Sequence, residues 1–352
     1  MHNSRFAPVS GMPRRGVLAA GGALGLGALL AACGSSSDSD AGSSDGSGTA
    51  GTAKTPSGPW SFTDDRKKTA KSDSVPTKIV AYSGTAAALY DFGIDCVGVF
   101  GPTTLKDGSA DPQAGDIDVS KVTILGNVWG EFNIEKYAAL SPDLLVTNMF
   151  EPPTLWDVPE ESADEILALA PSVGINVAKV MLTAPLQRYA DLAGSLGADL
   201  NSAQNTTQKT RFETASANLR AAVKANPGIK VLACSASADS FYVSTPSSAT
   251  DLSYYKSLGV DLIVPNKVVG GFFETLSWEN VAKYKADLIL LDDRAATLQP
   301  KDLTGKPTWG QLPAVKADQI LGWPSEPIYS YDKCAVQIEA LTKAITAAKK
   351  VS

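Results

Sequence analysis

The sequence predicts an α/β protein of two lobes with mostly parallel sheets, joined by a single long rigid helix. Past Pro76, short apolar runs alternate with helical patterns, which is typical of parallel strands with crossover helices. A long stretch of helix formers at 185–228 interrupts this alternation. Two similar segments, NIEKYAALSPDLLVTN at 133–148 and SWENVAKYKADLILLD at 277–292, flank that stretch, one on each side.

The first 32 residues have the composition of an export signal. Three arginines precede an apolar stretch at 16–32, which is too short and too rich in glycine to indicate a membrane span. The stretch ends in LAAC, which resembles the bacterial lipoprotein signal, whose cysteine receives a diacylglycerol before cleavage. Cys33 is therefore the predicted lipidation site. RRGVL at 14–18 also resembles a twin-Arg signal, so Sec and Tat export both stay open.

The segment after Cys33 is dominated by Ser, Gly, Asp, Thr and Ala, and it lacks Val, Leu, Ile and aromatic residues. Such a composition cannot bury enough apolar surface to offset the entropy lost on ordering, so we expect a flexible tether. The predicted organisation is a signal peptide at 1–32, the lipidated cysteine and tether at 33–58, an N-terminal lobe at 59–198, a connecting helix at 199–227 and a C-terminal lobe at 228–352.

Charge and histidine content exclude several functions. Without the three arginines of the signal, the formal net charge of −6 becomes −9, which argues against a nucleic-acid partner. The only histidine, His2, lies in the signal, so Ser-His-Asp and Cys-His catalysis and His-ligated zinc are excluded for the mature chain. Cys96, Cys234 and Cys334 permit one disulfide, but the sequence does not choose the pair.

Strand-like runs and helical patterns follow one another through both predicted lobes. In the first lobe the expected strands are 78–82, 97–101, 122–126, 143–148 and 172–177, with helices at 84–94, 134–140 and 162–170. In the second lobe the expected strands are 230–236, 241–244, 261–265, 287–292 and 319–323, with helices at 251–259 and 333–350.

The two similar segments carry a glutamate at the same place. Asn133 and Ser277 are good helix N-caps, so Glu135 and Glu279 fall at the second helical position. An acidic side chain there complements the helix dipole, which is a sufficient local reason for both glutamates.

Several phrases in order resemble the metal-chelate family of solute-binding proteins of ABC transporters. They include NIEKYAALSPDLLV, LAPSVGI at 169–175, LAGSLGADLNSAQ at 192–204 and WGQLPAVKADQI at 309–320, and the resemblance covers 76–350. The family binds ferric siderophores, cobalamin or haem between two lobes joined by one rigid helix. The resemblance also implies that Glu135 and Glu279 dock into arginine pockets on the two permease subunits, in addition to their role at the helix starts.

A binding protein of this build needs a cleft with apolar walls and a few fixed polar groups. Ligands in open α/β sheets lie beyond the carboxyl ends of the strands, and by this strand-end rule the candidates come from those loops. They are Tyr82, Trp129, Met149, Phe150, Tyr242, Phe273, Arg294 and Trp323. Each aromatic residue could instead belong to the core.

Three alternatives remain at this point. Tyr254 and Tyr255 could hold bare iron, but neighbours on a helix point about 100 degrees apart, so iron is expected inside its chelator and no metal or cofactor is expected on protein side chains. Asp292 and Asp293 could serve an exported hydrolase, but neighbours on a strand point to opposite faces. Cobalamin or haem could replace a siderophore.

The sequence thus predicts that the protein is not an enzyme. It is an exported, lipid-anchored and monomeric binding protein on the outer face of the cytoplasmic membrane, with an ABC permease as partner. The aromatic residues and single Arg294 favour a hydroxamate siderophore over an anionic catecholate.

Overall fold

The computed structural model describes residues 58–352. The predicted signal peptide, the lipidation site Cys33 and the tether up to residue 57 lie outside the described residues. Within the described part, no helix is both long and apolar enough to cross a membrane.

The first lobe is built on a fully parallel sheet. Its strands are β3 (Ile79–Tyr82), β4 (Gly98–Phe100), β5 (Thr123–Ile124), β6 (Leu144–Met149) and β7 (Ser172–Asn176), in the order β5-β4-β3-β6-β7. The central strands β3 and β6 are buried along their whole length, which explains their continuous apolar sequences. A short antiparallel hairpin, β1 (Trp60–Thr63) and β2 (Thr69–Ser72), precedes this sheet and was not predicted.

Helices connect the strands of the first lobe or follow the last of them. They are α1 (Ser83–Asp91), α2 (Ile134–Leu140), α3 (Ala163–Leu169) and α4 (Thr183–Ser195), with 3-10 turns η1 (Pro112–Ala114) and η2 (Glu160–Ser162). Helix α1 is almost completely buried, so its small residues let it pack closely on the sheet.

The second lobe has a mixed sheet. Strands β8 (Lys230–Ala236), β12 (Leu288–Asp292) and β13 (Ile320–Trp323) are parallel, whereas β9 (Phe241–Ser244) is antiparallel to β8 and to β11 (Phe273–Leu276). The order is β11-β9-β8-β12-β13, and β10 (Asp261–Leu262) also pairs with β8. The helical elements are α6 (Thr250–Ser257), η3 (Trp278–Lys283), α7 (Pro300–Leu303), η4 (Trp309–Gln311), α8 (Pro313–Lys316) and α9 (Tyr331–Ala347).

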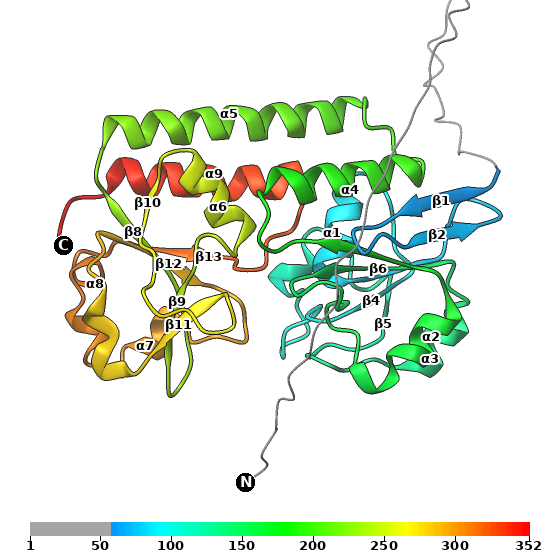
Figure 1. Cartoon of the computed structure of the whole chain (residues 1–352), viewed down its shortest axis with the longest axis horizontal. Coiled ribbons are helices and arrows are strands. Elements are labelled where there is room, and N and C mark those ends of the chain that lie inside the picture. The colour runs from blue at the N-terminus through cyan, green and yellow to red at the C-terminus, as the bar shows by residue number, and fades with distance from the viewer. Residues whose placement is uncertain (1–57) are drawn as a thin grey trace, which may run out of the picture. The chain divides into compact units, whose positions relative to one another are not determined.

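The long connecting helix is α5 (Ala203–Ala225), which lies within the predicted segment 199–227. Its 23 residues give a length of about 35 Å. Ser202 caps the start by accepting a hydrogen bond from Asn205 N (3.2 Å), and the helix ends before Asn226-Pro227-Gly228. Helix α5 lies alongside α9, and Arg211 joins them through Asp332 and Glu339, each at 2.8 Å (Figure 1).

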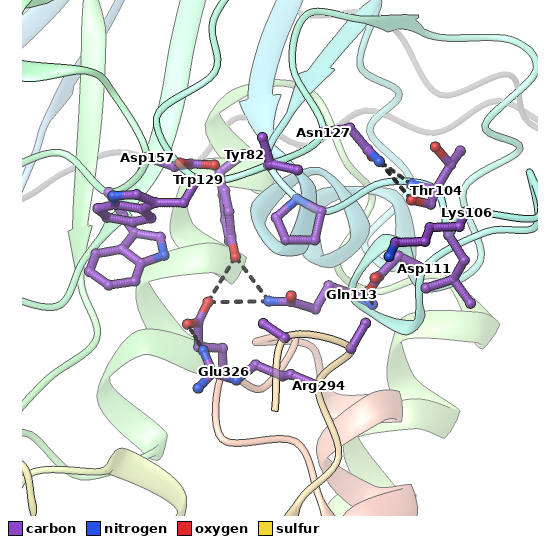
Figure 2. Close-up of a pocket in the computed structure, with 16 residues that line it drawn as sticks. Tyr82, Thr104, Lys106, Asp111, Gln113, Asn127, Trp129, Asp157, Arg294 and Glu326 are labelled. Carbon is purple, nitrogen blue, oxygen red and sulfur yellow. Dashed lines mark hydrogen bonds and ion pairs between the residues drawn. The ribbon is translucent and has the colours of Figure 1, made fainter. Parts of the chain in front are cut away.

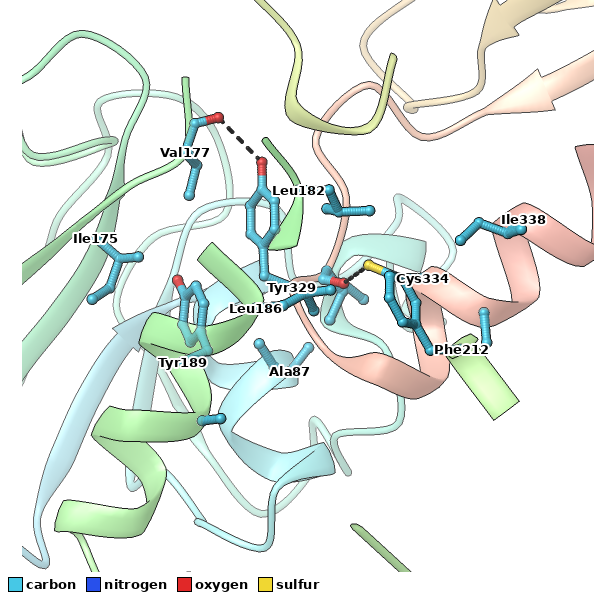
Figure 3. Packing of buried hydrophobic residues seen from close by; sticks show 14 of the residues in the cluster. Ala87, Ile175, Val177, Leu182, Leu186, Tyr189, Phe212, Tyr329, Cys334 and Ile338 are labelled. Atoms are coloured by element: carbon cyan, nitrogen blue, oxygen red, sulfur yellow. Dashed lines mark hydrogen bonds between the residues drawn. The ribbon is translucent and has the colours of Figure 1, made fainter. Parts of the chain in front are cut away.

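A shared apolar core connects the two lobes. Tyr189 of α4 and Tyr329, which precedes α9, stack with ring centroids 6.0 Å apart (Figure 3). The Tyr329 hydroxyl donates to Val177 O (3.5 Å), and Thr250 of the second lobe lies 3.3 Å from that hydroxyl. Buried residues of both sheets and of α5 and α9 belong to the same cluster. The lobes are therefore packed on one another and not merely tethered.

The second copy of the repeated segment differs from the prediction. Asn133 caps α2 as expected, with its side chain accepting from Lys136 N (2.8 Å), but η3 is a 3-10 helix whose N-cap Ser277 makes no such bond within residues 58–352. Trp278 and Val281 of this turn are both buried in the core of the second lobe. Among the described residues, Cys96, Cys234 and Cys334 form no disulfide.

Candidate ligand-binding cleft

Two cavities lie beyond the carboxyl ends of strands from both sheets. The first has a volume of about 430 Å³ and the second about 380 Å³. Tyr82, Trp129 and Arg294 line the first cavity, while Phe150, Phe273 and Arg294 line the second. The two cavities share Trp156, Arg294 and Glu326, so they form one divided cleft, and five of the eight predicted residues line it.

A polar network crosses the cleft at its centre. The Tyr82 hydroxyl donates to Glu326 Oε2 (2.8 Å), and Gln113 Nε2 donates to the Tyr82 hydroxyl (2.9 Å) and to Glu326 Oε2 (3.2 Å). Arg294 pairs with the other oxygen of Glu326, Oε1. Figure 2 shows Tyr82 and Gln113 converging on Glu326 from the first lobe, with Arg294 beside it. Donors from both lobes therefore meet on one carboxylate.

Arg294 is fixed by a second carboxylate, Asp292 at the end of β12. Its Nη2 contacts Asp292 Oδ2 at 2.8 Å, and its Nε lies 3.1 Å from Oδ1. Asp292 is fully buried and also accepts a hydrogen bond from the Ser325 hydroxyl (3.0 Å). Burial alone would lower the pKa of Arg294, but the contacts with Asp292 and the charge of Glu326 raise it, so the guanidinium is a permanent cation.

Close packing positions the Tyr82 side chain. Gly101 adopts φ +85°, and a Cβ there would lie 2.5 Å from the Tyr82 ring, so only glycine permits this approach. Burial raises the pKa of Tyr82 well above its ordinary value, and the charge of Glu326 raises it further. Tyr82 is therefore a neutral hydrogen-bond donor.

Aromatic side chains form the wall on the first lobe. Trp156 contacts Trp129 and Phe150, with ring centroids 4.5 and 4.6 Å apart. Trp129 is 66% exposed, so most of its ring is available to a ligand. Buried Asp157 holds the Trp129 loop by accepting a hydrogen bond from Gly130 N (2.8 Å), and burial raises the pKa of Asp157 to about 6.

The facing wall comes from β9, β11 and the loop before β11. Phe273 is 40% exposed and contacts Tyr242 edge to face, with centroids 5.1 Å apart. Phe272 lines the same cavity beneath the Lys179 ammonium, which lies 5.6 Å from its ring centroid. Tyr242 thus supports Phe273 from behind the cavity surface.

The structure places two predicted residues in the core. Met149 is fully buried, and its sulfur packs so close to Gly174 that a Cβ there would lie 2.8 Å away. Trp323 is 4% exposed, and its Nε1 donates to Asp251 Oδ2 (2.5 Å). Both residues lie at the end of a strand, where the strand-end rule places candidates. Their side chains are packed in the interior and do not line the cleft.

Glu326, Trp156 and Gln113 are central cleft residues that were not predicted from the sequence. Glu326 follows β13 by three residues, so the strand-end rule already pointed to its loop. Trp156 lies seven residues after β6, and Gln113 is in η1 of the long connection between β4 and β5. No periodicity or motif indicates where such loop residues return in space.

The fold places the two members of each alternative pair, the adjacent tyrosines and the adjacent aspartates, in different surroundings. Tyr255 is buried, whereas Tyr254 donates to Ser216 of α5 (3.0 Å) and stacks on Phe212. Asp292 is bound to Arg294, while Asp293 lies against Gly322 of β13, where a Cβ would be 3.1 Å from its carboxylate. Within residues 58–352, His, Cys, Asp and Glu side chains form no group of three that could hold a metal ion.

Glu135 and Glu279 are both exposed at the first turns of α2 and η3. A hydrogen bond from Ser277 lowers the pKa of Glu279, so this carboxylate is charged at neutral pH. Both are accessible to a partner.

The fold and the cleft agree with a sequence-family match. Residues 79–327 match the model of a periplasmic binding protein family. The chain belongs to this periplasmic binding protein family. Its members are binding proteins that work outside the cytoplasm, and the resemblance found in the sequence is confirmed at this level. A comparison with curated proteins returns no match.

Several solved structures share the architecture. DesE, a ferric-siderophore receptor protein from Streptomyces coelicolor, is 56% identical, with a TM-score of 0.81 over 83% of this chain and 100% of DesE. Staphylococcus aureus SirA, complexed with staphyloferrin B, is 18% identical, with a TM-score of 0.58 over 82% of this chain and 99% of SirA. PiuA, an iron uptake ABC transporter substrate-binding protein from Streptococcus pneumoniae, is 18% identical, with a TM-score of 0.59 over 83% of this chain and 100% of PiuA. At 18% identity the last two support the fold alone, and the predicted two-lobed α/β fold is confirmed.

Proposed function

We propose that this periplasmic binding protein captures a ferric siderophore, preferably of the hydroxamate type, and delivers it to an ABC permease. It does so as a monomer anchored to the outer face of the cytoplasmic membrane through lipid on Cys33. Iron is cargo that arrives inside its chelator, so the protein contacts the organic ligand and not the metal.

The observation that carries the proposal is the convergence of Tyr82, Gln113 and Arg294 in the cleft. All three present N–H or O–H donors toward Glu326, whose Oε2 accepts from Tyr82 and Gln113 and whose Oε1 pairs with Arg294. The oxygens that bind iron in a siderophore are acceptors of the same kind. A chelate whose oxygens replace this carboxylate would therefore find donors from both lobes.

The walls suit a compact organic complex. Trp129, Trp156 and Phe150 lie on one side and Phe273 on the other, and the volumes of about 430 and 380 Å³ fall in the range of small-molecule pockets. The relative with 56% identity is described as a ferric-siderophore receptor protein, which supports the same ligand class.

A fluorescence titration tests the proposal. Trp129 and Trp156 lie at the cleft, so a ferric trihydroxamate should quench tryptophan emission saturably at submicromolar concentration. The iron-free hydroxamate, a ferric tricatecholate, cobalamin and haem serve as comparison ligands. A variant with both tryptophans changed to phenylalanine should lose most of the quench. The proposal fails if none of the ferric complexes binds, and the ligand class changes if cobalamin or haem binds more tightly.

A further inference from the structure

The cleft is rich in carboxyl groups. Those that line its two cavities are Asp111, Glu151, Asp157, Asp292 and Glu326, whereas the lining cations are Lys106 and Arg294. Five acidic groups thus face two basic ones. This balance is unexpected for a site that is to hold a complex built from anionic oxygens.

The negative charge of Glu326 is not balanced by a cation of its own at the centre of the cleft. Asp292 already matches Arg294 through contacts to its Nη2, its Nε and its backbone N–H, the last at 3.1 Å. Glu326 is the second carboxylate on the same guanidinium, and its remaining partners, Tyr82 and Gln113, are neutral. The group of Asp292, Arg294 and Glu326 therefore carries a net negative charge.

Glu326 is also held in place. Its side chain is only 11% exposed, and it is bound by residues of both lobes. Pro324 and Pro327 flank it in the chain and restrict the backbone of this crossing segment. Rotating the carboxylate away would break contacts with Tyr82, Gln113 and Arg294 together.

We propose that Glu326 is a specificity-determining residue that admits ferric chelates of zero or positive net charge and rejects anionic ones. This inference rests on the proposed siderophore-binding function and names the charge class of its ligand. An anionic chelate that approaches Tyr82 and Arg294 either meets the Glu326 charge at close range or must displace it from its partners. A neutral chelate must also displace Glu326 from any donor that it takes over, but it is not repelled by the Glu326 charge.

The test uses two ferric complexes built on one tripodal scaffold, a neutral trihydroxamate and a triply anionic tricatecholate. Their affinities are measured by fluorescence titration for the wild-type protein and for Glu326→Gln. Glutamine keeps an acceptor oxygen for Tyr82 and Arg294 but removes the charge. The wild-type protein should prefer the neutral complex, and Glu326→Gln should shift the affinity ratio toward the anionic complex by at least about tenfold.

Glu165→Gln is the matched control, because Glu165 is an exposed carboxylate on α3 and its loss changes the total charge equally. Its ratio should equal that of the wild type. Melting curves establish that Glu326→Gln is folded, and Glu326→Asp, which keeps the charge, should retain the wild-type preference. An unchanged ratio in Glu326→Gln, or an equal loss of both complexes, overturns the inference and leaves the proposed function standing. Failure of the wild type to bind either complex overturns both.

Discussion

Asp143 in the first lobe and Asp287 in the second make the same contact with their sheets. Asp143 Oδ2 accepts a hydrogen bond from Lys78 N (3.0 Å), and Asp287 Oδ2 accepts one from Lys230 N (2.9 Å). Each aspartate precedes a central strand, β6 or β12, and clamps the start of the neighbouring central strand. The aspartate of the repeated segment thus joins the same two central strands in each lobe. The glutamate of the segment lies in the first turn of the helix or 3-10 turn that precedes this aspartate.

Replacing Asp143 with asparagine should destabilise the protein by about 1–2 kcal/mol at pH 7, because the amide oxygen can still accept the hydrogen bonds but lacks the charge that strengthens them. Partial burial would raise the pKa of Asp143, but its bonds to Lys78 N and Thr77 N outweigh burial and lower it. The stabilisation is therefore present at neutral pH and is lost as the pH falls below about 4 through the lowered pKa. Urea unfolding at pH 7 and pH 3 should show a deficit at pH 7 that shrinks at pH 3. A deficit of equal size at both pH values would contradict this reading.

Charge reversal at Glu135 or Glu279 should reduce siderophore uptake by about tenfold or more, because an opposing charge would replace each predicted contact with a permease arginine. Affinity for the ferric complex should stay unchanged, since both side chains lie on the outer surface. Uptake of labelled iron by cells and titration of the purified variants measure the two effects separately. Glu165→Lys is the control for charge alone. A loss of ligand affinity in Glu135→Lys or Glu279→Lys would show that the docking assignment is wrong.

Trp129 and Trp323 should respond oppositely to replacement by alanine. Trp129→Ala should lower affinity for the ferric complex by about tenfold and change stability by less than about 0.5 kcal/mol, because the ring is mostly exposed. Trp323→Ala should cost about 3–5 kcal/mol of stability, since it opens a cavity and leaves buried Asp251 without its donor. Chemical denaturation and titration of both variants check the contrast. Similar stability losses in the two would contradict their placement.

Arg294→Lys should reduce affinity for the ferric complex by about tenfold, because a lysine cannot span Asp292 and Glu326 as the guanidinium does. Arg294→Met should also destabilise the fold by about 3–5 kcal/mol, since it leaves buried Asp292 without its cation. Isothermal titration and thermal melting separate the two variants. Wild-type affinity in Arg294→Lys would show that the Arg294 guanidinium does not contribute to ligand binding.

Cys33→Ala should abolish lipidation of the exported protein, because the thiol that would carry the predicted diacylglycerol is removed. Labelling of cells with a radioactive fatty acid, followed by isolation of the protein, measures the effect. The purified variant should bind the ferric complex as the wild type does. Fatty-acid labelling that survives the substitution would refute lipidation at this cysteine.

The sequence was most informative where one local rule determined the outcome. Alternating apolar runs located the strands of both sheets, and the strand-end rule found Tyr82, Phe150 and Arg294 at the cleft. The same rule also selected Met149 and Trp323, because it names a loop but not the direction in which a side chain points.

The rest of the cleft depends on long-range packing. Gln113 reaches Glu326 across more than 200 residues of chain, and no local pattern encodes that contact. Trp156 was missed because its loop returns toward Trp129 only after the sheet has formed. Ser277 was predicted to cap an α-helix, but the segment that follows it is a 3-10 helix, although its sequence resembles that of α2.

The core that contains Tyr189, Tyr329 and residues of α5 and α9 has a thermodynamic consequence. Because buried side chains of both lobes belong to one cluster, neither lobe can melt without exposing apolar surface of the other. The two lobes therefore share a single cooperative unfolding transition, and a destabilising change in one lobe lowers the melting temperature of the whole body.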